Sequence, residues 1–145
     1  MPMTELPFGA YRNLIDIFGK ETLSKFRVEY NNNCEGLANA IKDIMNANGY
    51  MAEIITFKNG NAFLDGGIKV SGKIYTHHTI VLMGEWIIDA LHTDDVIKTK
   101  DYIETLQKDN DKLRIDYTIS TGWYDENGMP YQPTIDDLKN YKLNI

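Results

Sequence analysis

Four residues of this chain have side chains that indicate catalysis: one cysteine, two adjacent histidines and one aspartate. Cys34 comes directly after three asparagines, which are good N-caps, so we expect it in the first turn of a helix and outside the helix's apolar stripe. A thiol there lies at the positive end of the helix dipole, which favours the nucleophilic thiolate, and near backbone N–H groups that can hold an oxyanion. A cysteine that only packs would instead share the stripe of Leu37 and Ile41.

The sequence also offers a base for this thiol, because a cysteine nucleophile needs an imidazole and the imidazole needs an acceptor. Two β-rich runs, 78–83 and 86–91, flank a glycine turn and predict a tight hairpin. In that register positions 78 and 89 are diagonal neighbours on one face, whereas His77 projects to the other face. Asp89 lies between apolar residues and is costly unless paired, so His78 is its expected partner. A structural hydrogen bond without a catalytic role is the alternative.

Elements that hold these residues follow from the spacing of apolar side chains. Helical spacing predicts a helical entry segment over 8–27, a strong helix over 34–48 and a further helix near 100–108. Strands are expected at 50–57, around 68–75 and near 113–119, with a turn at 58–61. A loop over 120–133 precedes a short helix that Thr134 and Asp137 cap. Helices first and antiparallel strands afterwards predict an α+β fold.

Composition sets the broad class of protein. The 145 residues are a common domain size, so we expect one domain over 1–145. The formal charge of −6 gives no electrostatic attraction to phosphate backbones, so nucleic acid is not an expected partner. A single cysteine makes no internal disulfide. We expect no membrane span and no signal peptide, because no apolar run is long enough; export would therefore need a carrier segment.

The arrangement of Cys34 at a helix start, then a strand that begins with His78, a glycine turn and a strand that ends in Asp89 resembles a known family. It is similar to the papain-like fold in its compact bacterial form, which shades into transglutaminase-like and arylamine acetyltransferase-like enzymes. The resemblance covers roughly residues 31–92, and its most specific piece is 78–89. It implies N-terminal helices, with the nucleophile at a helix N-terminus, packed on an antiparallel sheet. It also implies a Cys-His-Asp triad: nucleophile, general base and acid, and orienting residue.

The same resemblance implies a reaction class. Members cleave or exchange acyl bonds, so protease, protein glutamine deamidase and transglutaminase-like activities are all expected candidates, and none needs a cofactor. The glutamine that donates to the oxyanion in papain itself has no match in this chain. Asn31, Asn32 or Asn33 is a candidate substitute, and the backbone N–H of Cys34 is another.

The group also includes the toxin domains of bacterial polymorphic and contact-dependent growth inhibition toxins. By this resemblance the domain is part of a larger secreted or delivered bacterial protein and acts on a protein substrate in the cytoplasm of the target cell. A cognate immunity protein that covers the Cys34 cleft is then the expected partner.

Two other interpretations of the sequence stay open. One is a non-catalytic protein-binding module that uses the aromatic loop 120–133; Trp86, Trp123 and Tyr124 are weak candidates for lining a substrate groove, since such aromatic residues more often pack. The other is a metal-dependent hydrolase that uses His77 or His78 with His92. We expect no metal there, because His77 and His78 project to opposite faces of a strand.

Overall fold

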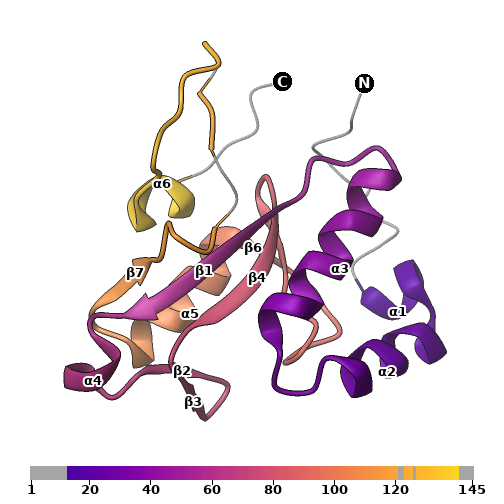
Figure 1. Ribbon diagram of the computed structural model, residues 1–145, viewed down its shortest axis with the longest axis horizontal. Helices are drawn as coiled ribbons and strands as arrows, with labels where there is room; N and C mark the ends of the chain where they lie inside the picture. Colours follow the sequence, from indigo (N-terminus) through magenta and orange to yellow (C-terminus); the bar gives the residue numbers. More distant parts are fainter. Residues whose placement is uncertain (1–12, 121–122, 126, 141–145) are drawn as a thin grey trace.

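The computed structural model describes residues 13–120, 123–125 and 127–140 (Figure 1). The helices of this part of the chain are α1 (Leu14–Phe18), α2 (Lys20–Glu29), α3 (Cys34–Ala47), α4 (Ala62–Asp65), α5 (Thr99–Asp109) and α6 (Ile135–Lys139). The strands are β1 (Glu53–Asn59), β2 (Ile68–Val70), β3 (Lys73–Tyr75), β4 (His78–Met83), β5 (Trp86–Ile88), β6 (Val96–Lys98) and β7 (Leu113–Ile115). In these residues no helix is both long enough and apolar enough to cross a membrane.

The predicted entry segment is two helices rather than one. Asn13 caps α1 through its side-chain oxygen, which accepts from the N–H of Ile15 at 2.8 Å. Gly19 has a φ of +81°, outside the helical region, and it separates α1 from α2. Residues 8–12 of that prediction lie outside the described residues.

The helix expected over 34–48 is confirmed as α3, which begins at Cys34 and ends at Ala47. Asn33 is its N-cap, and its side-chain oxygen accepts from the N–H of Gly36 at 2.9 Å. A Cβ atom at position 36 would come within 2.6 Å of the capping amide, so this cap requires glycine. The first turn of α3 is therefore tightly fixed.

The main sheet is antiparallel throughout and has the strand order β6-β5-β4-β1-β7. Its β4–β5 hairpin has the predicted register, with Val81 opposite Ile88 and Met83 opposite Trp86. The second strand is shorter than expected, because the chain turns away after Ile88. The mixed α+β class with an antiparallel sheet is confirmed.

Other strand ends also differ from the sequence prediction. β1 starts at Glu53 rather than at residue 50, because Asn46 of α3 holds both backbone groups of Ala52, at 2.7 and 3.1 Å. The segment 68–75 is a separate small hairpin, with β2 and β3 joined by a turn at Ser71-Gly72. β7 ends at Ile115 instead of residue 119. The capping box of Thr134 and Asp137 on α6 is confirmed.

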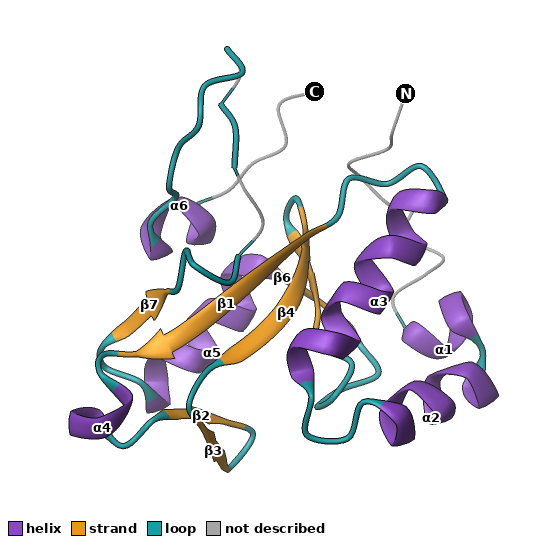
Figure 2. Cartoon of the chain, viewed as in Figure 1, coloured by secondary structure: helices purple, strands orange, loops and turns teal. Residues whose placement is uncertain are grey.

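Helices cover both faces of the five-stranded sheet (Figures 1 and 2). Side chains such as Ile54 and Val81 pack with the buried side of α3, whereas Ile55 and Ile80 pack with α5. Neighbouring residues of one strand thus serve opposite cores, as the two-residue period of a strand requires. Each fully buried aliphatic side chain stabilises the fold by about 1.5–3 kcal/mol relative to exposure. This packing places α3 on one face of the sheet and α5 on the other, with His78 on the strand between the two helices.

Candidate active site

Cys34 is the first residue of α3, as expected, and it is half-buried. The expectation that it lies outside the apolar stripe is wrong. Positions 34, 37, 38 and 41 share one helix face, and Cys34 lines a small cavity of about 10 Å³ together with Leu37, Ala38 and Ile41. The same face that packs on the sheet therefore carries the sulfur to β4.

The backbone N–H of Thr79, on β4, is the donor that the sheet offers to the Cys34 sulfur. Thr56 uses its N–H and carbonyl on the β7 side, with Ser120 and Asp116, so the backbone groups of its partner Thr79 point toward β5. β5 has already ended at Ile88 there. The Thr79 N–H instead donates to Sγ of Cys34 at 3.4 Å. A gap at the end of β5 is thus filled by the cysteine.

His78 and Asp89 meet as the hairpin register predicts. Nε2 of His78 lies 2.9 Å from Oδ2 of Asp89, and both residues are buried. His77 is half-exposed and its Nδ1 lies 3.4 Å from the hydroxyl of Thr76. The register therefore distinguishes the two adjacent histidines, and only His78 faces the carboxylate.

Asp89 has two further partners that the sequence analysis did not identify as such. The hydroxyl of Tyr102, on α5, donates to its Oδ2 at 2.8 Å. Nδ1 of His92 lies 3.0 Å from Oδ1 and 3.1 Å from Oδ2. With three hydrogen-bonding side chains around it, this buried carboxylate stays ionised, and the pKa of Asp89 lies well below its usual range even though burial opposes the charge.

The His78 ring is enclosed on several sides. Tyr75 stacks on it with a ring-centroid distance of 5.7 Å, and His92 approaches edge-on at 4.9 Å. The Tyr75 hydroxyl lies 2.9 Å from Nε2 of His92. Since Nδ1 of His92 donates to Asp89, Nε2 is the acceptor of the Tyr75 hydroxyl when that ring is neutral. This network fixes the position of the His78 ring before any substrate arrives.

The second ring nitrogen of His78, Nδ1, is the one that is not bound to Asp89. Nδ1 is buried and has no hydrogen-bond partner among the described residues, so it is the nitrogen left to exchange a proton with Cys34.

The side chains of Cys34 and His78 are close enough for each to stabilise the charged form of the other. Burial raises the pKa of the Cys34 thiol, but His78 and the Thr79 N–H outweigh it, and the net pKa is lowered. Burial lowers the pKa of His78, but Asp89 and Cys34 outweigh it and raise the pKa to about 9. Both directions favour a thiolate and imidazolium pair.

The asparagine candidates for an oxyanion donor are placed as follows. Asn33 uses its side-chain oxygen to cap α3, Asn32 has a left-handed backbone with a φ of 59°, and Asn31 is exposed. Among the described residues, none of these three asparagine side chains forms a hydrogen bond with Sγ of Cys34. The backbone N–H of Thr79 is the donor that does reach the sulfur.

The three aromatic groove candidates do not come together. Trp86 packs on the α3 side of the sheet and lies under the ammonium group of Lys98, 5.8 Å from the ring centroid. Trp123 is buried on the α5 side, and Tyr124 beside it is exposed. Trp123 and Tyr124 line a separate pocket after β7.

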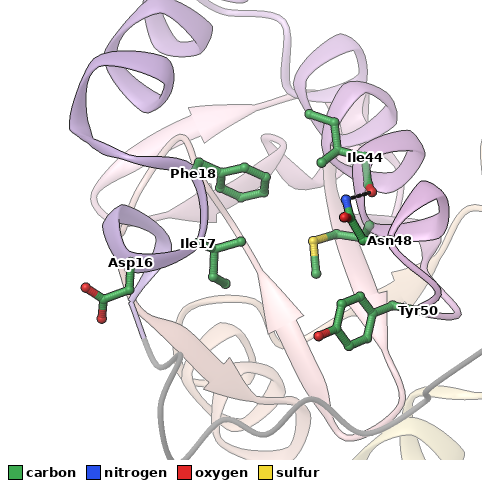
Figure 3. A pocket seen from close by; sticks show the side chains of 7 residues that line it. Asp16, Ile17, Phe18, Ile44, Asn48 and Tyr50 are labelled. Carbon is green, nitrogen blue, oxygen red and sulfur yellow. Dashed lines mark hydrogen bonds between the residues drawn. The ribbon is translucent and has the colours of Figure 1, made fainter.

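A further hollow of about 340 Å³ lies between α1 and the C-terminal half of α3 (Figure 3). Phe18, Ile44 and Tyr50 turn toward it, and Asp16 lies at its edge. Among the described residues, no cysteine or histidine lines this hollow.

Metal ligands are also present at the site. Nitrogen atoms of His78 and His92 and a carboxylate oxygen of Asp89 lie within 4.8 Å of one another. His77, the other histidine considered from sequence, is not in this group. Nitrogen and carboxylate oxygen atoms in such a set suit Zn²⁺, and His78, Asp89 and His92 are the residues that would hold it.

No protein-family model matches the sequence, and neither the curated proteins nor the solved structures include a match.

Proposed function

We propose that this protein is a cysteine-dependent acyl-transfer enzyme, of papain-like fold, with Cys34, His78 and Asp89 as nucleophile, general base and acid, and orienting residue. The observation that carries the proposal is the buried His78 ring, held by Asp89 at one nitrogen and left unpartnered at the other, beside a half-buried thiol at a helix start. Cys34 shares the apolar helix face of Leu37 and Ile41, as a packing cysteine would, but packing alone requires no imidazole held in this way.

The mechanism follows from the charge states that the site favours. The Cys34 thiolate attacks a substrate carbonyl carbon, and the carbonyl electron pair moves to oxygen. His78 gives its Nδ1 proton to the leaving amine as the C–N bond breaks, which leaves a thioester on Cys34 and a neutral imidazole. His78 then takes a proton from water, whose oxygen attacks the thioester. The acid product leaves, and the thiolate and imidazolium are restored. An amine in place of water gives transfer instead of hydrolysis.

Each remaining group has a defined task in these steps. Asp89 holds the His78 tautomer and stabilises the imidazolium. The N–H groups in the first turn of α3 and the N–H of Thr79 are the donors near the developing oxyanion. The cavity beside the sulfur holds only about 10 Å³, so the substrate carbonyl approaches from the exposed side of Cys34.

The biological setting is part of the proposal. We place the domain within a larger secreted or delivered bacterial toxin that acts on a protein in the target-cell cytoplasm, with a cognate immunity protein that covers Cys34. The support is the resemblance of residues 31–92 together with the acidic character of the chain.

Thiol alkylation tests the chemistry directly, because Cys34 is the sole cysteine of the sequence. Iodoacetamide should label the folded protein at pH 7 at least about tenfold faster than the unfolded protein, since the thiolate is favoured. His78→Gln should lower the rate, and His77→Gln is the matched control that should not. Labelling as slow as that of the unfolded chain would contradict the proposal.

The toxin setting has a separate test. Expression of the protein in a bacterial cytoplasm should arrest growth, and Cys34→Ala should remove this effect.

A metal-dependent hydrolase is the second candidate, favoured by the group of His78, Asp89 and His92. The two candidates differ in one experiment. Activity that is lost with a chelator and retained in Cys34→Ala would favour the metal enzyme, whereas the reverse pattern favours the cysteine enzyme. Activity that survives both changes would eliminate both.

A further inference from the structure

The loop after β7 forms a small hairpin that projects from the body of the molecule (Figure 2). Tyr124 pairs with Pro130, and the N–H of Tyr131 donates to the carbonyl of Trp123 at 3.0 Å. At the tip, the Asp125 carboxylate accepts from the N–H groups of Asn127 and Met129, each at 2.9 Å. This part of the loop is therefore held in a defined shape.

A pocket of about 380 Å³ lies at the base of this hairpin. Its lining is aromatic with a few polar groups, and it consists of Tyr117, Ser120, Trp123, Tyr124, Pro130, Tyr131 and Gln132. Trp123 is 7% exposed, whereas Tyr124 is 66% exposed. The pocket thus has a buried tryptophan and exposed tyrosines, ring types whose faces attract cations.

Three carboxylates lie near Tyr131, which forms one wall of this pocket. The carboxylates of Glu53, Asp125 and Asp137 are close enough to Tyr131 to raise the pKa of its hydroxyl, in addition to burial. Among the described residues, no lysine or arginine lines the pocket, and none forms a salt bridge with these three carboxylates. Burial raises the pKa of Glu53 to about 7. A cation bound beside Tyr131 would favour the ionised form of this carboxylate.

The pocket also has an unused donor. The indole N–H of Trp123 is buried and has no acceptor among the described residues. A buried donor without an acceptor is costly, and a peptide carbonyl would relieve that cost. A polypeptide with a basic side chain offers both the cation and the carbonyl, which a free cation does not.

We propose that this aromatic pocket is a docking site for an arginine or lysine side chain of a protein partner, separate from Cys34. The charge complementarity of the pocket with a basic residue and the unused Trp123 donor carry the proposal. A line of hydrogen bonds connects the two places: Ser120 accepts from the Thr56 N–H, and the Thr56 hydroxyl contacts that of Thr79 at 2.7 Å. Thr79 in turn donates to Cys34, so the pocket lies two strands from the sulfur. Docking does not require that Cys34 be catalytic.

Calorimetric titration of the Cys34→Ala protein tests the docking without turnover. The probes are an acetylated Gly-Gly-Arg-Gly-Gly peptide, the same peptide with citrulline in place of arginine, and butylguanidinium. The arginine peptide should bind about tenfold more tightly than the citrulline peptide, because citrulline keeps the shape and loses the charge. It should also bind more tightly than butylguanidinium. Equal affinity for the arginine and citrulline peptides would overturn the proposal. If butylguanidinium binds as tightly as the arginine peptide, the site takes free cations and the docking of a polypeptide is overturned.

Three variants assign the binding to this pocket. Tyr124→Ala removes an exposed ring with no effect on folding, and Glu53→Gln keeps the shape and removes the charge; each should weaken the arginine peptide several-fold. Tyr50→Ala, in the hollow between α1 and α3, is the control that should change nothing. Affinity should rise as pH increases through about 7, where Glu53 ionises, and should stay flat in Glu53→Gln. Unchanged affinity in both Tyr124→Ala and Glu53→Gln would place binding elsewhere and refute the proposal.

Discussion

His78 and Cys34 approach each other from opposite faces of the sheet. His78 lies in register with Ile80, on the face that α5 covers, whereas Cys34 belongs to α3 on the other face. They meet because β5 ends at Ile88 and leaves the Thr79 N–H to the sulfur. The end of one strand therefore creates the place where thiol and imidazole interact.

Replacing Asp89 should separate its electrostatic task from its structural one. Asp89→Asn keeps hydrogen bonding and removes the charge, so turnover should fall far more than stability. Asp89→Ala leaves the buried donors of His78, His92 and Tyr102 without their acceptor and should cost about 3–5 kcal/mol of unfolding free energy. Denaturant unfolding and an activity assay of both variants check this. A fully active Asp89→Asn protein would show that another group orients His78.

The two adjacent histidines should behave differently. His78→Ala should abolish activity, because its ring is the one that contacts Asp89 and acts on Cys34. His77→Ala should retain activity, since His77 is half-exposed, lies one residue before β4 and has its Nδ1 near the hydroxyl of Thr76. Turnover or growth-inhibition assays of the two folded variants measure the difference. Equal loss in both would leave the assignment without support, and loss in His77→Ala alone would reverse it.

The Tyr102 hydroxyl should contribute to stability through the carboxylate it contacts. Tyr102→Phe removes one hydrogen bond to a buried charge and keeps the ring, so we expect a loss of about 1.5–3 kcal/mol in unfolding free energy. Tyr117→Phe, which loses a hydrogen bond to the uncharged carbonyl of Pro133, is the comparison and should cost less. Urea unfolding of both proteins gives the values. An equal cost in both would argue that the charge of Asp89 adds nothing.

Stability should depend on pH through His78. Its pKa in the folded protein is about 9, above the ordinary value of 6.5, so its contribution is fully present below pH 6.5 and is lost as pH rises toward 9. The loss across that window is on the order of 3 kcal/mol. Thermal melts of the native protein and of His78→Gln from pH 6 to 9.5 test it. The same slope in both proteins would mean that His78 is not the group responsible.

Local patterns in the sequence were sufficient for the parts of the site that lie on single elements. Asparagine capping before an apolar helical pattern places Cys34 at the start of α3, because caps and periodicity act within one turn. The glycine turn and the two-residue period of the strands set the β4–β5 register and so bring His78 to Asp89. The capping hydrogen bond and the alternation of side chains along a strand both act between residues close in sequence.

Tertiary packing alone decided the rest of the site. His92 is the exception, because a local turn, closed by bonds from the N–H groups of His92 and Thr93 to the carbonyl of Asp89, returns it to the carboxylate. Tyr102 reaches Asp89 because α5 packs across the sheet face that His78 shares. The end of β5, which frees the Thr79 N–H, likewise has no local signal. These contacts depend on how separate elements fill a common core, and the pattern along any one element does not contain that information.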